Sequence, residues 1–207
     1  MTNDKHHTLM ESNHSQRSLI LASSSVFRKS LLDRLQLEFD IDSPDIDESQ
    51  HTNESPHDYV SRLSLEKAQA VAPRQSDSLI IASDQCCVLN DRITGKPGNH
   101  ENAIEQLQAS SGNKVSFLTG LCALDTRTGK YYLDVIPFHV HFRNLSLAEI
   151  DRYLSAEQPY YCAGSFMAEG LGISLFKKLE GDDPTALVGL PLIRLCEMLR
   201  EFGHKLP

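Results

Sequence analysis

The stretch Ser18–Leu32 reads SLILASSSVFRKSLL and combines an apolar run, three consecutive serines and two cations. Its apolar run, Leu19–Ala22, predicts a buried strand, and the leucine spacing that follows predicts a helix. The hydroxyls of Ser23–Ser25 and the guanidinium of Arg28 stand where the strand passes into the helix, and helix N-termini bind phosphate groups well. A serine that only caps the helix, followed by solvated cations, explains the same residues with about equal weight.

Strand-like and helix-like segments alternate along the rest of the chain, which predicts a mixed α/β fold. Ser55 and Pro56 start one helix as N-cap and first residue, and Ser146 with Glu149 forms a capping box that starts another. The expected helices are 24–37, 56–72, 99–112, 146–157 and 191–202, and the expected strands are 19–22, 79–83, 114–125 and 130–142. Residues 1–17 are polar and aperiodic, so we expect a flexible N-terminal extension before a single domain, 18–207.

The composition limits the classes of function. The 207 residues are 40% hydrophobic and carry a net charge of -8, which disfavours a protein that coats nucleic acid or anionic lipid. A polyanionic ligand must therefore meet a local cluster of cations. No apolar run is long enough to cross a membrane and no secretory signal is present, so the sequence predicts a cytoplasmic location without a membrane partner. The five cysteines are odd in number and scattered, which indicates reduced thiols.

Carboxylates follow two of the predicted turns. Asp84 comes directly after an apolar strand, a position that faces the ligand crevice in many α/β proteins. Asp45, Asp47 and Glu48 form a second acidic run. Two carboxylates that converge beside a phosphate group can hold a divalent metal ion. Taken alone, Asp84 could merely begin a turn, and an acidic run of this kind is more often a solvated loop.

Two lysines and one glutamate stand out by their surroundings. Lys67 falls on the apolar face of a predicted helix, where a cation is unusual. Lys96 lies in the turn TGKPG, which glycine and proline make rigid enough to aim a side chain. Glu169 is the single acid of a glycine-rich loop, CAGSFMAEGLG, and a carboxylate there could contact a ligand or simply cap a helix.

Several common catalytic motifs are absent. The sequence has no GxxxxGK[ST], GxGxxG, HExxH or GxSxG, which disfavours a P-loop ATPase, a dinucleotide enzyme, a zinc protease and an α/β-hydrolase. His139 and His141 alternate on a predicted strand, a pattern more typical of a sheet surface than of a metal site.

The order of the motifs carries more information than any one of them. The chain resembles the Maf family of nucleotide pyrophosphatases from about Leu19 to Phe202. The segments that carry the resemblance are LILASSSVFRKSLL, SPDIDES, LEKAQAV, IIASDQ, ITGKP, SGNKVSFLTGL and CAGSFMAEGLGISLF. The resemblance implies an α/β fold like that of inosine triphosphate pyrophosphatase, with two lobes around a deep central cleft, a long mixed sheet and, often, a homodimer. It also implies hydrolysis of a nucleoside triphosphate, an acid anhydride, to a monophosphate and pyrophosphate with a divalent cation such as Mg²⁺ or Mn²⁺.

The resemblance assigns roles to individual residues. Asp84 would accept the proton of the attacking water, and Glu48 together with Asp84 would bind the metal. The residues assigned to the triphosphate are Ser23, Arg28, Lys67 and Lys96.

Base preference divides the family, and this sequence is most similar to the YceF-like branch, which acts on 7-methyl-GTP. The resemblance places Phe27, Gln85 and Glu169 in the base pocket as the substrate-specificity residues. Methylation at N7 makes guanine cationic, so an aromatic face gains a cation–π term of about 0.5 to 2 kcal/mol. Members of this branch typically have tryptophan where Phe27 stands, and a smaller ring stacks less strongly.

Two other functions fit the same motifs. One is a broader pyrophosphatase that acts on dTTP, UTP or several modified bases. The other is a nucleotide-binding regulator of cell division, which would bind a nucleotide without turnover. The pairing of Glu48 with Asp84 favours an enzyme, because a protein that only binds nucleotides has no need of a metal-and-base pair.

Overall fold

The computed structural model describes residues 17–207. The expected flexible extension, with His6, His7 and His14, lies outside the described residues except for Arg17. Arg17 contacts the domain through an ion pair of 2.5 Å with Asp125.

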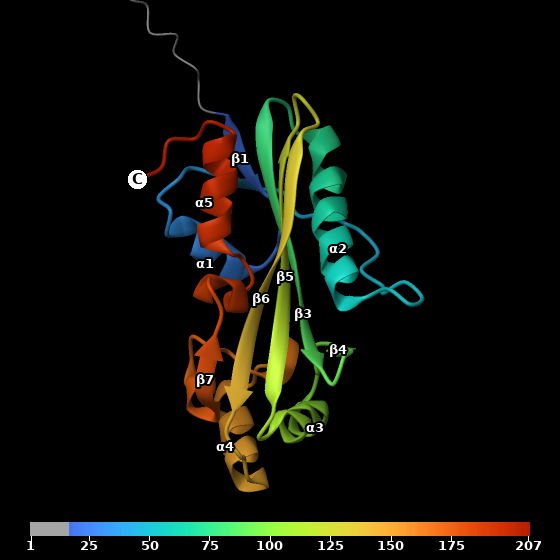
Figure 1. Ribbon diagram of the computed structural model, residues 1–207, viewed down its shortest axis with the longest axis vertical. Helices are drawn as coiled ribbons and strands as arrows, with labels where there is room; N and C mark the ends of the chain where they lie inside the picture. The colour runs from blue at the N-terminus through green and yellow to red at the C-terminus, as the bar shows by residue number, and fades with distance from the viewer. Residues whose placement is uncertain (1–16) are drawn as a thin grey trace, which may run out of the picture.

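A single mixed sheet organises the chain (Figure 1). Its strands run in the order β2-β1-β3-β5-β6-β7, with β4 paired to β3 at one end. The strands β1, β2 and β3 are parallel, whereas all pairs from β3 to β7 and the β3–β4 pair are antiparallel. The strands are β1 Ser18–Leu21, β2 Asp40–Ile41, β3 Ser78–Leu89, β4 Arg92–Thr94, β5 Lys114–Asp125, β6 Tyr131–Phe142 and β7 Phe176–Glu180.

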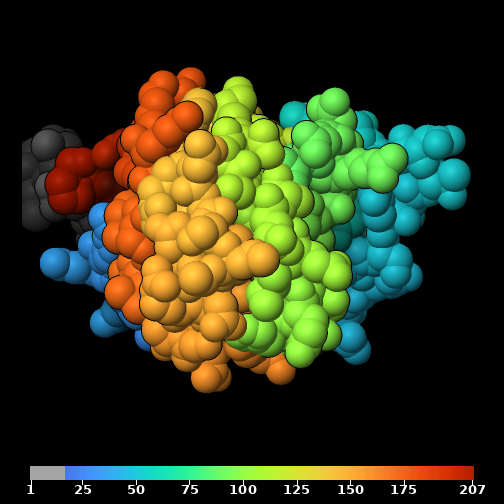
Figure 2. Space-filling view, turned by 90° about the horizontal axis from the view of Figure 1, so that it is seen from below, coloured from blue at the N-terminus to red at the C-terminus, as the bar shows by residue number. Residues whose placement is uncertain are grey.

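Five α-helices cover this sheet in two groups (Figure 1). They are α1 Val26–Asp33, α2 Pro56–Val71, α3 His100–Ser110, α4 Leu147–Glu157 and α5 Leu192–Glu201. In the upper part, α1 and α5 lie on one side of the sheet and α2 on the other, while α3 and α4 lie at the lower end. Seen from below, α3 and α4 lie side by side and cover that end (Figure 2). Four short 3-10 turns complete the chain: η1 Ala72–Arg74, η2 Ala163–Ser165, η3 Leu171–Leu175 and η4 Pro184–Val188.

The hydrophobic core is divided in the same way. One cluster of buried residues lies in the lower part, where Leu107, Phe117 and Leu154 pack together. Two further clusters lie in the upper part, around Leu121 and around Ile80. Because β3, β5 and β6 are each 12 residues long, they pass through both parts and join them. The mixed α/β class and the long mixed sheet are therefore confirmed.

The predicted helix starts are confirmed by their caps. The Ser55 side chain accepts the backbone N–H of Asp58, and Pro56 is the first helical residue of α2. The capping box of α4 is formed in both directions between Ser146 and Glu149. Such caps satisfy N–H groups that the helix itself cannot pair.

Two predicted ends are wrong: the first helix ends at Asp33 and not at 37, and the strand that carries the candidate base is longer than expected. We expected a strand to end before Asp84, but β3 continues to Leu89, so Asp84 lies within the strand. Polar residues at 84 and 85 interrupt the apolar run that the prediction followed. The strand continues because its backbone pairs with β5 through Val88, whatever its side chains are.

Two further properties were expected from the composition. Along residues 17–207 no helix combines the length and the apolar character that a membrane crossing requires. All five cysteines are free thiols; three are buried and two are partly buried.

Candidate active site

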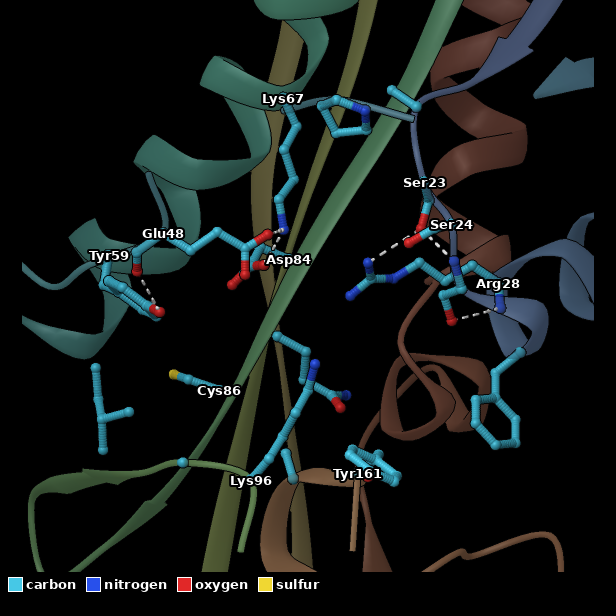
Figure 3. Close-up of a pocket in the computed structure, with 18 of the residues that line it drawn as sticks. Ser23, Ser24, Arg28, Glu48, Tyr59, Lys67, Asp84, Cys86, Lys96 and Tyr161 are labelled. Atoms are coloured by element: carbon cyan, nitrogen blue, oxygen red, sulfur yellow. Dashed lines mark hydrogen bonds and ion pairs between the residues drawn. The ribbon is translucent and has the colours of Figure 1, made fainter. Parts of the chain in front are cut away.

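Two carboxylates meet at one buried ammonium group (Figure 3). The Nζ of Lys67 donates to Asp84 Oδ1 at 2.6 Å and lies 2.7 Å from Glu48 Oε1. The side chains of Lys67 and Asp84 are 7% and 9% exposed, whereas that of Glu48 is 55% exposed. The cation that the sequence placed on an apolar helix face thus neutralises the acidic pair.

The charge of Lys67 changes the acidity of Glu48. Partial burial acts to raise the pKa of the Glu48 carboxyl, but the hydrogen bond and charge of Lys67 outweigh it. Lys96 and Arg28 add smaller contributions in the same direction, so the pKa of Glu48 lies below its usual value. Glu48 is therefore an anion at neutral pH, as a metal ligand must be.

Helix α2 positions Asp84 through a close approach to the sheet. The Ser64 hydroxyl donates to Val60 O at 2.7 Å and accepts the backbone N–H of Asp84 at 3.0 Å. The facing residue on β5 is Gly120, where an added Cβ would lie 2.3 Å from Val60 O. Glycine at this position lets the helix lie close enough for Lys67 to reach Asp84.

The exposed loop that carries Glu48 is tied to α2 by two side chains. The Tyr59 hydroxyl donates to Glu48 O at 3.0 Å. Arg62 donates to both carboxylate oxygens of Glu54, at 2.6 and 2.8 Å, and to Ser49 O at 3.1 Å. Burial, followed by the charges of Asp84 and Glu48, raises the pKa of Tyr59 to about 12, so this phenol stays a hydrogen-bond donor.

Arg28 lies across the cavity from the acidic pair (Figure 3). Its Nε donates to Gly189 O at 2.8 Å, and its Nη1 lies 3.4 Å from Ser23 Oγ. The N–H of Ser25 also points to Ser23 Oγ, at 3.1 Å. Burial lowers the pKa of Arg28 and the negative charges of Asp84 and Glu48 oppose this shift, so the guanidinium remains charged.

These groups line one cavity of about 540 Å³, which we call the main cavity. Its lining residues include Ser23, Phe27, Arg28, Glu48, Tyr59, Lys67, Asp84, Gln85, Cys86, Lys96 and Tyr161. Asp45 and Asp47 do not line it, so only the last residue of the acidic run reaches the site. Lys96 lies on the lower side of the main cavity (Figure 3).

A smaller cavity of about 170 Å³, the side cavity, adjoins the main cavity. The two share Ser25, Phe27, Arg28, Gln85, Lys96, Tyr161 and Ala163. The side cavity adds a more apolar surface that includes Phe117, Phe166, Met167 and Leu187, and it also contains Glu169. All nine residues to which the family resemblance assigns a role therefore line one of two adjoining cavities, with eight in the main cavity and Glu169 in the side cavity.

The amide of Gln85 has a fixed orientation. Its Nε2 lies 2.7 Å from Ala186 O, 3.1 Å from Leu187 O and 3.0 Å from Thr119 Oγ1. The two backbone carbonyls can only accept, so the amide nitrogen must face them. The Thr119 hydroxyl donates to Ala186 O at 2.9 Å and so accepts from Gln85. Gln85 consequently offers only its amide oxygen to a ligand in the cavities.

Sequence reasoning missed four residues of the site. Tyr59, Cys86 and Tyr161 line the main cavity, and packing brings them there. Thr119 lies in the segment SGNKVSFLTGL and acts indirectly, by accepting from the Gln85 amide. Burial, followed by the charge of Asp84, raises the pKa of Cys86 to about 12, so its thiol is no nucleophile at neutral pH. The sequence offered one signal for Tyr59: it lies in the same predicted helix as Lys67, eight residues earlier.

The acidic pair fits a divalent metal in part. No group of three or more histidine, cysteine, aspartate or glutamate side chains within residues 17–207 could enclose a metal ion. Mg²⁺, however, commonly binds through one or two carboxylates together with substrate phosphates and water. Glu48 and Asp84 reach the same nitrogen atom, so they also converge closely enough to share a cation.

The fold and the cavities define an α/β protein that can receive a phosphorylated, partly apolar ligand near a pair of carboxylates. The chain matches the model of the family described as Maf-like protein over residues 18–202, and it belongs to that family. It is 57% identical to a 7-methyl-GTP pyrophosphatase of Pseudomonas savastanoi pv. phaseolicola over 92% of this chain and 99% of that protein. It is also 57% identical to a protein of the same name from Alcanivorax borkumensis, over 92% of this chain and 96% of the relative. A third relative of that name, from Pseudomonas fluorescens, is 56% identical over 91% and 98% of the two chains.

Proposed function

We propose that the protein hydrolyses 7-methyl-GTP to 7-methyl-GMP and pyrophosphate, and so removes a modified nucleotide before it enters RNA. The observation that carries the proposal is the arrangement of one cleft: a paired glutamate and aspartate at a buried lysine, cations on the other walls, and an adjoining pocket with apolar and acceptor groups. The names of relatives that share more than half of their residues with the chain support the substrate.

Cations on several walls of the cleft would bind the triphosphate. Arg28 and Lys96 line the main cavity from different segments, and Ser23 adds a hydroxyl near the start of α1. Their local positive charge offsets a net charge of -8 that would otherwise repel the substrate. The charge of Lys67 is already paired with the carboxylates of Glu48 and Asp84, so Lys67 would contribute less than Arg28 or Lys96 to binding the phosphates.

Asp84 would accept the proton of the attacking water. The water oxygen bonds to phosphorus, the anhydride bond between the α- and β-phosphates breaks, and pyrophosphate leaves with the electron pair. The rigid strand and the Ser64 hydrogen bond fix the Asp84 backbone, which limits the motion of this base.

Glu48 and Asp84 would hold the divalent cation. When bound, such a cation neutralises phosphate charge and stabilises the charge that builds up in the transition state. The Tyr59 and Arg62 contacts hold the Glu48 loop against α2, so these two carboxylates are positioned before any ion arrives.

The base pocket would present acceptors to the donors of guanine. The Gln85 oxygen and the Glu169 carboxylate can accept from N1–H and the exocyclic amine. The carboxylate also offsets the positive charge of the methylated base, and Phe27 offers an aromatic face.

A substrate panel tests the proposal. Pyrophosphate release by the purified protein with Mg²⁺ or Mn²⁺ should be fastest from 7-methyl-GTP, compared with GTP, UTP, dTTP and ITP. The variant Asp84→Asn should lose at least about 100-fold in kcat, because a neutral amide cannot accept the proton. Similar efficiency on UTP and dTTP would favour a broader pyrophosphatase. Tight nucleotide binding without turnover would favour a regulator, and full activity of Asp84→Asn would show that the assigned base is wrong.

A further inference from the structure

Two consecutive tyrosines after α4 have different surroundings. Tyr160 is anchored: its backbone oxygen accepts from Gly98 N at 2.9 Å, and its hydroxyl lies 2.9 Å from Nδ1 of His100. The other ring nitrogen of His100 lies 3.1 Å from Asp151 Oδ1. Tyr161, by contrast, is 80% exposed and has no hydrogen bond or ring contact with any residue of the described range 17–207.

Tyr161 stands at the tip of a tight turn. The N–H of Cys162 donates to Pro159 O at 3.1 Å and closes the turn. Because the anchored Tyr160 fixes one side of the turn, Tyr161 is held toward the cavities, where it lies at the lower border of the main cavity (Figure 3). Because the backbone of the turn is already fixed, a ligand that contacts this ring has only the side-chain torsions of Tyr161 to order.

Phe27 comes to the same place from a different wall. It lies in the first turn of α1, is 37% exposed, and lines both the main and the side cavity, as Tyr161 does. Among residues 17–207, the two rings do not stack on each other or on another aromatic ring. Two exposed aromatic rings that do not stack on each other therefore line both cavities.

We infer that Tyr161 is a second specificity-determining residue, which stacks on the methylated base from the side opposite Phe27. This inference rests on the proposed function. A cationic ring gains a cation–π interaction with each aromatic face that it contacts, while a neutral guanine gains only ordinary stacking. Phe27 alone offers a small face, so the second ring supplies part of the discrimination between 7-methylguanine and guanine. Glu169 in the side cavity supplies the counter-charge.

Calorimetric binding of the products 7-methyl-GMP and GMP, measured without metal, tests this role. We expect Tyr161→Leu to weaken binding of 7-methyl-GMP about 5- to 10-fold and of GMP by no more than about twofold. Tyr161→Phe should stay within about twofold of the wild type for both, because the ring and not the hydroxyl makes the contact. Tyr131→Leu, which alters an exposed tyrosine far from the cavities on β6, is the matched control and should change neither affinity.

Kinetics provide a second measurement. With 7-methyl-GTP, Tyr161→Leu should raise KM about 5- to 10-fold and leave kcat within about twofold, since the ring does not touch the reacting atoms. Equal losses for both products, no loss for either, or a Tyr161→Phe variant as weak as Tyr161→Leu would overturn the stacking role. Those outcomes leave the proposed function intact if the wild type still prefers 7-methyl-GTP. A wild type without that preference would overturn both.

Discussion

Replacing Lys67 by methionine tests the electrostatic centre of the site. The change keeps most of the apolar stem and removes the charge that lies 2.6 Å from Asp84 and 2.7 Å from Glu48. Breaking a buried ion pair from one side costs about 3 to 5 kcal/mol, because the remaining charge stays desolvated. Glu48 is 55% exposed and can be rehydrated, so we expect the lower end, about 3 kcal/mol, in the free energy of unfolding.

A divalent cation should restore much of this loss. If Glu48 and Asp84 form the metal site, Mn²⁺ can supply the positive charge that Lys67→Met removes. Urea denaturation of both proteins, in EDTA and in Mn²⁺, measures the effect: Mn²⁺ should stabilise the variant more than the wild type. Pyrophosphate release should still fall about 100-fold or more, the loss typical of removing one electrostatic contact to the reacting group.

Lys177→Met is the matched control, because Lys177 is exposed on β7 and lies outside both cavities. It should match the wild type in every measurement. If Lys67→Met is as stable as the wild type in EDTA, the buried ion pair does not matter for stability. If Mn²⁺ stabilises both proteins equally, Lys67 and the metal do not share the same carboxylates, and the reasoning fails.

Three other changes test the elements that position the site. Arg62 lowers the pKa of Glu54 from 4.5 to about 2. The Glu54 carboxylate therefore stabilises the fold fully above about pH 4.5, and this stabilisation is lost as the pH falls toward 2. Arg62→Met should flatten the dependence of the unfolding free energy on pH in this window, as measured by denaturation at several pH values. Thr119→Val removes one acceptor of the Gln85 amide and should lower the 7-methyl-GTP to UTP ratio of kcat/KM several-fold, while Thr119→Ser keeps it; an unchanged ratio would refute the fixed amide. Gly120→Ala places a Cβ against the backbone of α2 and should lower the unfolding free energy by about 1 to 3 kcal/mol; a thermal melt equal to that of the wild type would show that the helix adjusts without cost.

Hydrogen bonds to the backbone oxygens of residues 186–189 link this C-terminal segment to the site. Gly189 O accepts from Arg28 Nε and from the Ser83 hydroxyl, at 2.8 and 2.9 Å. Asp183 holds the segment by accepting the N–H groups of Thr185 and Ile193. The turn η4, which carries no catalytic group, thus sets the positions of an arginine and a glutamine that line the cavities.

Much of the fold could be predicted from local chemistry. Caps such as Ser55 with Pro56, and Ser146 with Glu149, act within one turn, so the sequence itself defines these helix starts. The α/β class follows from the alternation of segments. The strand boundary at Asp84 could not be predicted, because β3 is continued past Asp84 by backbone pairing with β5, a segment distant in the sequence.

For the site, the sequence by itself determined which residue types are available: cations in an acidic chain, a glutamate in a glycine-rich loop, and a lysine on an apolar helix face. The tertiary structure alone decided how they are used. It joined Lys67 to both carboxylates, used the Gln85 amide nitrogen in contacts with η4 and Thr119, and brought Tyr161 to the same cavities as Phe27. Each of these depends on contacts between distant segments, whose distances and directions are set by the packing of helices on the long strands and not by any local pattern.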